Sequence, residues 1–162
     1  MVNKNNPIDI TAEEERQLWI LLSEAQRLTV AAAEKELKPL GITLVQSGVL
    51  YVLNTMKKEG ISSTPAEIAR WLSRRPITVS ALLKRMEKQG LVIQRRDISP
   101  KRIQVEMTEK GEQIYREMTA NRKAVPTILC SLSPSQRQQM KIYLGKLTSK
   151  AQLFLLEPPY QY

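Results

Sequence analysis

The chain has 162 residues, a single cysteine and no histidine, and its 25 Lys and Arg residues exceed its 16 Asp and Glu residues to give a net charge of +9. The lone Cys130 excludes an intramolecular disulfide framework, and the lack of histidine removes the commonest general base and metal ligand. No glycine-rich phosphate loop occurs, and no apolar run is long enough to cross a bilayer. We therefore expect a cytoplasmic binding protein, not an enzyme, that uses no cofactor, metal or membrane.

The positive charge is concentrated between residues 61 and 102. This segment contains ten basic and three acidic residues, so it supplies seven of the nine net charges, whereas residues 1–60 sum to −1 and residues 103–162 to +3. A focused basic surface of this kind suits a polyanion, most simply nucleic acid.

Two helices are expected before the basic segment. Thr11 has the residue type and position of a helix cap, and the helix that it starts is expected to end near Lys38. Thr43 and Gln46 form a capping-box pattern for a second helix that reaches about Lys57. Apolar residues surround most of this second helix, which predicts that it is buried.

The basic segment begins with two short helices joined by a tight turn. Thr64 is followed by Pro65, a proline at the first helical position, and the helix is expected to end at Leu72. Pro76 can open the next helix, and Gly90 is its expected end. This spacing predicts a helix-turn-helix, whose second helix has an apolar stripe of Val79, Leu82, Leu83 and Met86.

A β-hairpin and two further helices are expected next. Residues 91–96 and 103–107 alternate in the manner of half-buried strands around a charged turn. Thr108 caps a fifth helix that runs to about Lys123, with Pro126 expected to kink or end it, and a sixth helix begins at Pro134.

The second short helix presents small, polar and basic residues opposite its apolar stripe. Such a face can enter a major groove, where hydroxyls and basic groups bind phosphates or base edges and apolar groups meet thymine methyls. The alternative is the solvated face of an ordinary amphipathic helix, but the capped partner helix, the equally basic hairpin and the concentrated charge favour DNA. The candidate DNA contacts are Arg74, Arg75, Ile77, Thr78, Ser80, Ala81, Lys84, Arg85, Arg95, Arg96, Lys101 and Arg102.

Four stretches together resemble the MarR family of winged-helix transcriptional regulators. They read Ser-Thr-Pro-Ala-Glu-Ile-Ala (63–69), Thr-Val-Ser-Ala-Leu-Leu-Lys-Arg-Met-Glu-Lys-Gln-Gly-Leu-Val (78–92), Arg-Arg-Asp (95–97) and Met-Thr-Glu-Lys-Gly (107–111). The resemblance implies a mainly α fold with a small β-hairpin wing. It also implies a single domain over residues 1–162, with a winged helix-turn-helix lobe at 42–107 and helical dimerisation regions at 8–38 and 108–156.

By the same resemblance, the chain is expected to act as a homodimer on a roughly palindromic site in double-stranded DNA, as a ligand-responsive repressor. Its recognition helix falls on residues 76–89 and its wing on residues 95–103. Two departures from the family pattern stand out: Ala81 replaces a common arginine, and Ile98, Ser99 and Pro100 replace polar or acidic residues at the wing tip. The resemblance also implies an ion pair between an aspartate and an arginine of the wing, for which Asp97 and Arg102 are the candidates.

The resemblance further implies a small aromatic or phenolic effector, for which Trp19, Tyr51 and Trp71 are the aromatic candidates, although ordinary packing would also explain them. Cys130 is expected to be a buried, inert thiol rather than an oxidant sensor. The competing interpretation of the whole chain is a winged-helix protein-interaction module that does not bind DNA. Such a module would present acidic or apolar residues where this chain has Lys84 and Arg85.

Overall fold

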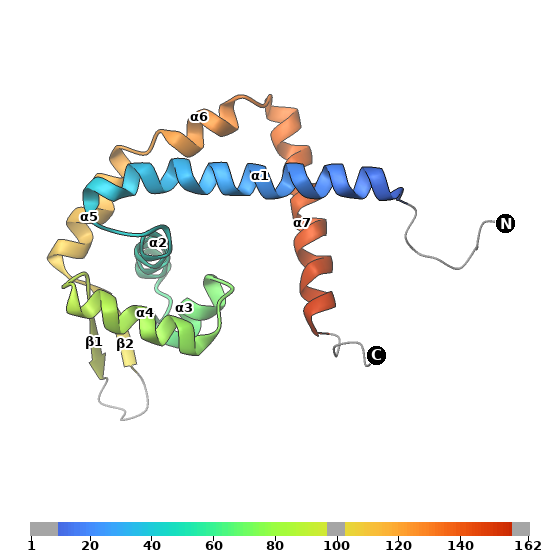
Figure 1. Ribbon diagram of the computed structural model, residues 1–162. Helices are drawn as coiled ribbons and strands as arrows, with labels where there is room; N and C mark the ends of the chain where they lie inside the picture. Colours follow the sequence, from blue (N-terminus) through green and yellow to red (C-terminus); the bar gives the residue numbers. More distant parts are fainter. Residues whose placement is uncertain (1–9, 97–102, 157–162) are drawn as a thin grey trace. The chain divides into compact units, whose positions relative to one another are not determined.

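The computed structural model describes residues 10–96 and 103–156 (Figure 1). The chain divides into two compact units, Met1–Ala124 and Val125–Tyr162. Both strands found in the described residues belong to the first unit, so the helix-turn-helix and the hairpin lie together there. The expected fold class, mainly helical with a small two-stranded wing, is confirmed.

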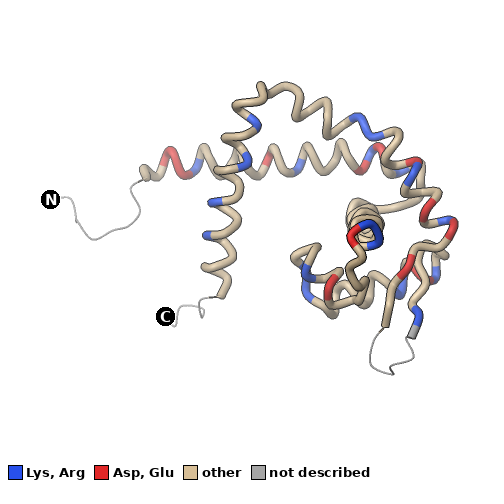
Figure 2. Tube along the Cα trace, turned by 180° about the vertical axis from the view of Figure 1, so that it is seen from behind, with Lys and Arg blue, Asp and Glu red and all other residues tan. Residues whose placement is uncertain are grey.

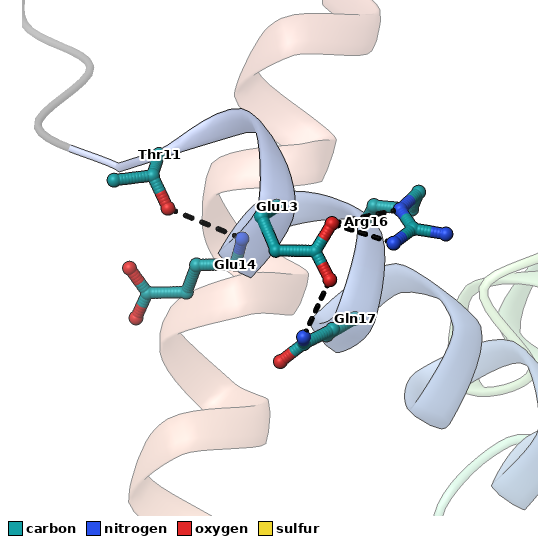
Figure 3. A network of polar contacts seen from close by, with 5 residues as sticks. All are labelled: Thr11, Glu13, Glu14, Arg16 and Gln17. Carbon is teal, nitrogen blue, oxygen red and sulfur yellow. Dashed lines mark hydrogen bonds and ion pairs between the residues drawn. The ribbon is translucent and has the colours of Figure 1, made fainter.

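The first helix, α1, spans Ala12–Leu37, as expected from its cap. The Thr11 hydroxyl accepts a hydrogen bond from the N–H of Glu14 at 3.2 Å, and the Glu13 carboxylate beside it accepts from Arg16 at 2.5 Å (Figure 3). The bond from Arg16 lowers the pKa of Glu13. Acidic groups in a first turn also interact favourably with the helix dipole, so this end of α1 is well specified by its own sequence.

The second helix, α2, spans Leu44–Glu59 and follows a short 3-10 helix, η1, at Lys38–Leu40. The expected capping box forms: Gln46 donates its backbone N–H to the Thr43 hydroxyl at 3.4 Å and accepts from the N–H of Thr43 at 2.8 Å. Seen end-on in Figure 1, α2 lies in the middle of the first unit and packs against α1, α3, α5 and β2. The prediction that α2 is buried is therefore confirmed.

Helices α3, at Pro65–Trp71, and α4, at Pro76–Lys88, form the expected helix-turn-helix. Thr64 caps α3 through its side chain, and each helix has a proline in its first turn. In the turn between them Ser73 adopts a left-handed φ of 50°. The two helices pack against each other, so α3 sets the position of α4.

The hairpin consists of strand β1 at Val92–Arg96 and strand β2 at Ile103–Met107, paired antiparallel. The expected turn, residues 97–102, lies outside the described residues. The N–H of Val105 donates to the carbonyl of Ser63 at 3.0 Å. This bond fastens β2 to the segment that leads into α3, so the wing and the helix-turn-helix form one body.

Helix α5 spans Glu109–Ala120 and is capped by the side chain of Thr108, as expected. The prediction that it continues to about Lys123 is wrong, because α5 ends at Ala120 with Asn121 as its C-terminal cap. Pro126 does not kink or end this helix either, since it belongs to a separate helix, α6, at Ala124–Cys130. Pro126 lies in the first turn of α6, where a backbone N–H has no helical partner in any case, so the proline fits without kinking a helix.

The start of α6 is set by a residue that is distant in the sequence. The Glu36 carboxylate, near the end of α1, accepts hydrogen bonds from the N–H groups of Lys123 at 2.9 Å and Ala124 at 2.7 Å. A carboxylate at this place binds the first backbone donors of the new helix, and its negative charge interacts favourably with the positive end of the helix dipole.

The core of the first unit is apolar and is assembled from α2, α3, α4 and the wing. Its residues come from one face of each element, as the periodicity predicts for helices and strands that share a single core. The largest fully buried side chains are Leu50, Met56, Ile68, Leu83, Met86, Leu91, Val49, Val79, Val92 and Val105.

The second unit contains most of α6, together with α7 at Pro134–Leu156. The side-chain oxygen of Gln136 accepts the N–H of Ser133 at 2.8 Å, and Gln136 donates its own N–H to the Ser133 hydroxyl at 3.3 Å, so the two residues cap α7. α7 exposes many large apolar side chains, and its charged residues are Lys and Arg without Asp or Glu (Figure 2).

Candidate DNA-binding surface

Helix α4 separates its buried and exposed residues as the sequence predicts. Val79, Leu82, Leu83 and Met86 are all buried against the core of the first unit. The opposite side is open, and Ile77, near the start of the helix, is 78% exposed. The seven candidate residues that the structure leaves exposed here are Arg74, Arg75, Ile77, Thr78, Ala81, Lys84 and Arg85, while Ser80 is half-buried.

The start of α4 is open as well. Arg75, the residue before the helix, makes no side-chain cap, and Pro76 has no N–H to satisfy. The N–H of Thr78 is already bonded to the Arg75 carbonyl at 3.0 Å, but the first turn still carries the positive end of the helix dipole. In combination with the exposed Arg74 and Arg75 side chains, this end of α4 can bind an anionic phosphate.

The cations on this surface are available to a ligand. Arg74, Arg75, Lys84 and Arg85 form no ion pair with any other described residue, whereas Arg70 on the neighbouring helix is held by Glu67 at 2.6 Å. A guanidinium or ammonium group without an acidic partner attracts an external anion more strongly, because no local carboxylate neutralises it.

The wing adds basic residues close to α4. Arg95 on β1 is exposed and lies 3.4 Å from the Glu106 carboxylate on β2. Arg96 ends β1, although its side chain is not described. Figure 2 shows the basic end of β1 next to the grey trace of residues 97–102, which include the candidates Lys101 and Arg102 and the expected Asp97 pair. For those residues the sequence prediction stands without a structural description.

A contact between α4 and the wing was not foreseen from the sequence. The Glu87 carboxylate accepts hydrogen bonds from the backbone N–H of Gln94 at 2.8 Å and from its side-chain amide at 2.9 Å. The two hydrogen bonds link the last turn of α4 to β1. No local sequence pattern predicts them, because a glutamate on an exposed helix face usually contacts only solvent. They keep the two basic elements in one orientation.

The three aromatic candidates for effector binding lie on the surface of the described structure. Trp19 on α1 is 69% exposed, Tyr51 on α2 is 54% exposed and Trp71 at the end of α3 is 40% exposed. Ordinary core packing, the alternative explanation of these residues, therefore does not account for them within the described residues. None of the three lines the cavity of the first unit described next.

A cavity of about 410 Å³ lies elsewhere in the first unit, between α2, β2 and α5. At its edge the Lys57 ammonium group donates to the Glu112 carboxylate at 2.8 Å. This hydrogen bond lowers the pKa of Glu112 and raises the pKa of Lys57, so the pair links α2 to α5 in the charged form. The cavity is lined by Leu53, Lys57, Ile61, Ser63, Val105, Glu106, Met107 and Glu112.

Other kinds of site find no support in the described part of the chain. Its acidic and cysteine side chains form no group of three or more that could hold a metal ion. Cys130 is exposed at the end of α6, so the expectation that it is buried is wrong. No described helix combines the length and the apolar character needed to span a membrane.

Comparison with known proteins agrees with this geometry. Residues 40–103, from the turn before α2 to the first residue of β2, match the model of the MarR family. The HTH-type transcriptional repressor Rv2887 of Mycobacterium tuberculosis is 31% identical over 115 residues, which cover 70% of this chain and 80% of the relative.

Two solved structures resemble the chain over most of its length. The organohalide-sensing transcriptional regulator RdhR in its 2,4-dichlorophenol-bound form has a TM-score of 0.75 and 26% identity, covering 100% of this chain and 99% of that one. The Staphylococcus aureus MepR–DNA complex has a TM-score of 0.73 and 25% identity, covering 88% of this chain and 99% of that one. The exposed basic helix, its wing and these similarities agree: the chain belongs to the MarR family of winged-helix, DNA-binding transcriptional regulators.

Proposed function

We propose that this protein represses transcription as a homodimer bound to a palindromic site in double-stranded DNA, in the cytoplasm, and that it acts by binding rather than by catalysis. The observation that carries the proposal is α4, which is buried along one side and presents unpaired cations and small polar residues along the other. A helix of this kind fits the width of the major groove.

The residues of α4 have different roles in this proposal. Arg74, Arg75, Lys84 and Arg85 bind phosphates or guanine edges, and Thr78 and Ser80 bind phosphates or base edges through their hydroxyls. Ile77 and Ala81 contact thymine methyl groups, which explains why an isoleucine is left 78% exposed at the start of this helix.

The wing serves as a second, mainly electrostatic contact. Arg95 and Arg96 flank the DNA backbone, while Lys101 and Arg102, placed here by sequence alone, reach towards a neighbouring minor groove. A narrow minor groove has a strong negative potential that attracts basic side chains.

Dimerisation is supported by what α1 and α7 leave exposed. Leu18 and Leu21 on α1, and Leu144 and Leu147 on α7, are among many large apolar side chains that each helix leaves exposed, and exposed apolar helix faces of this kind mark association sites. The charges agree, because α1 carries six acidic and three basic residues and α7 only basic ones. We assign residues 42–107 to the DNA-binding lobe and residues 8–38 and 108–156 to dimerisation.

We further propose that a small aromatic or phenolic molecule releases the protein from DNA. RdhR, which senses organohalides, binds 2,4-dichlorophenol in the structure cited above. In this chain Trp19, Tyr51 and Trp71 remain the candidate contacts, since exposed rings of this size could pack against such a molecule once a second protomer covers them.

Selection of sites from a randomised DNA duplex pool tests the proposed function. An inverted repeat with half-sites about one helical turn apart is expected, because the two-fold symmetry of the dimer imposes that of the site. No enrichment would favour the protein-interaction module instead. Deleting residues 134–162 should yield a monomer or an aggregate with much weaker binding, and a stable truncated dimer of full affinity in light scattering and DNA titration would contradict the proposed dimer.

Substitution of single basic residues tests the proposed surface. Lys84→Ala should weaken binding to all sequences about equally and lower the slope of log affinity against log salt by about one, as loss of one phosphate contact does. Lys58→Ala removes the same charge from the exposed end of α2 and is the matched control. Equal effects of the two variants would show that α4 does not face DNA.

A further inference from the structure

Gln46 is buried at the start of α2, with 5% of the residue exposed. Its orientation follows from its partners. The backbone N–H of Thr43 can only donate, so the Gln46 oxygen faces Thr43, at 2.8 Å, and the amide nitrogen must face the other way. There it donates to the side-chain oxygen of Gln89 at 2.5 Å.

Gln89 caps the C-terminal end of α4. Gln46 and Gln89 are 43 positions apart in the sequence, so their contact is a tertiary one, which joins the first turn of α2 to the end of the helix that reads DNA. The same end of α4 is held by α5, because Lys110 donates to the Gln89 carbonyl at 2.9 Å and the Thr108 hydroxyl donates to the Gly90 carbonyl at 2.5 Å.

The hydrogen bonds at this end of α4 can fix the register of the helix, which its apolar stripe cannot. Burial of Val79, Leu82, Leu83 and Met86 holds the helix against the core, but hydrophobic contact is non-directional and tolerates small rotations and slides. Hydrogen bonds depend steeply on distance and angle. A buried amide with both ends engaged therefore selects one register of α4, and an incorrect register would leave polar atoms unsatisfied in the core.

We propose that Gln46 is a positioning residue for DNA recognition: through Gln89 it sets the register of α4, and so the alignment of Thr78, Ser80 and Ala81 with the bases. This inference rests on the proposed function. Gln46 and Gln89 do not contact DNA in this proposal, and phosphate binding by flexible basic side chains depends little on the exact register of α4. Loss of the bond should consequently reduce the preference for the specific site more than it reduces binding to DNA in general.

Two substitutions of Gln89 of similar length separate this role from others. Gln89→Glu keeps an oxygen that accepts from Gln46, whereas Gln89→Met removes the acceptor, and Gln89 is exposed, so both proteins should fold. The quantity to measure is the ratio of affinities for the selected duplex and for a scrambled duplex, at one salt concentration. Taking a ratio cancels the general effect of the added charge of Gln89→Glu.

Gln89→Met should lower this ratio about tenfold, the size of effect that one lost buried hydrogen bond produces, while Gln89→Glu should stay within about twofold of the wild type. The salt slope should remain close to that of the wild type because no phosphate contact is lost, whereas a general structural defect would weaken binding to the selected and the scrambled duplex alike. Gln46→Met, which removes the donor to Gln89 together with the bond from Thr43, should lower the ratio as well, and combining it with Gln89→Met should add little.

The inference is overturned if Gln89→Met keeps the wild-type ratio, or if Gln89→Glu and Gln89→Met lose it equally. It is also overturned if every variant weakens specific and scrambled DNA to the same extent. These results would leave the proposed function intact, since the wild type would still prefer its site. A wild-type protein without any preference would overturn the proposed function and this inference together.

Discussion

Gly111, in the first turn of α5, is the position where an added methyl group should destabilise the protein most. A Cβ built there would lie 2.1 Å from the carbonyl oxygen of Leu91 and 3.1 Å from its carbonyl carbon. The same oxygen accepts the N–H of Thr108 at 3.2 Å, so it cannot turn away without losing that bond. The obstructing atoms belong to the backbone of Leu91, so no change of side-chain rotamer removes the clash.

The magnitude of the effect of Gly111→Ala follows from two opposing contributions. Real Cβ contacts stay beyond 3.0 Å, so α5 and the segment that joins α4 to β1 must separate by 0.9 Å or more. Overpacking of this kind costs about 1–3 kcal/mol, against a gain of about 1 kcal/mol from the better helix propensity of alanine. Because the obstacle is backbone, the upper end of this range applies, and we expect a net loss of about 2 kcal/mol in the free energy of unfolding. DNA binding should weaken as well, because Leu91 links the recognition helix to the wing.

Gly48→Ala in α2 is the matched control, because its Cβ would meet only the Cδ2 atom of Leu72, at 3.3 Å, and a leucine side chain can shift by the small amount needed. Urea unfolding followed by circular dichroism gives both free energies. Gly111→Ala should be less stable than the wild type, and Gly48→Ala should be equally or more stable. If Gly111→Ala unfolds at the wild-type urea concentration, the close approach of α5 to Leu91 is incorrect.

Three further outcomes follow from the polar contacts of the first unit. Burial raises the pKa of Tyr115, whose hydroxyl accepts a hydrogen bond from Asn54 at 2.9 Å, so this tyrosine ionises at a lower pH in the unfolded chain than in the folded protein. The free energy of unfolding of the wild type should therefore fall above pH 10 more steeply than that of Tyr115→Phe, and parallel curves in alkaline unfolding would contradict this. The hydrogen bond from Lys57 lowers the pKa of Glu112, so Glu112→Gln should be less stable than the wild type at pH 7 but equally stable at pH values below that lowered pKa. If Glu112→Gln is still less stable in acid, the ion pair with Lys57 is not the cause of the loss. Thr64→Ala, which removes the α3 cap, should cost about 1 kcal/mol in urea unfolding, and no change would show that the cap contributes nothing.

Much of this fold could be predicted residue by residue because its helix starts are local. Thr11, Thr43, Thr64 and Thr108 each accept from a backbone N–H three residues later, which requires only the right residue at that spacing. Pro76 opens α4 for a similar reason, since its fixed φ and missing N–H suit a first turn.

The candidate site was predictable to the extent that periodicity decides which side of a helix is buried. The apolar stripe of α4 and its basic opposite side follow from the 3.6-residue repeat, so the exposed candidates required no tertiary information. The exposure of Trp19, Tyr51 and Trp71 did require it, because an aromatic residue has the same type in a core and on an association surface.

The sequence by itself therefore determined the order of α1 to α5 and α7, the wing and the charged face of α4, since these depend on interactions within a few residues or on a repeat along one element. Only the tertiary structure decided where α6 begins, how Gln46 meets Gln89 and why α5 needs a glycine against Leu91. Each of those depends on the distance between atoms from segments far apart in the chain, and packing of the whole unit sets that distance.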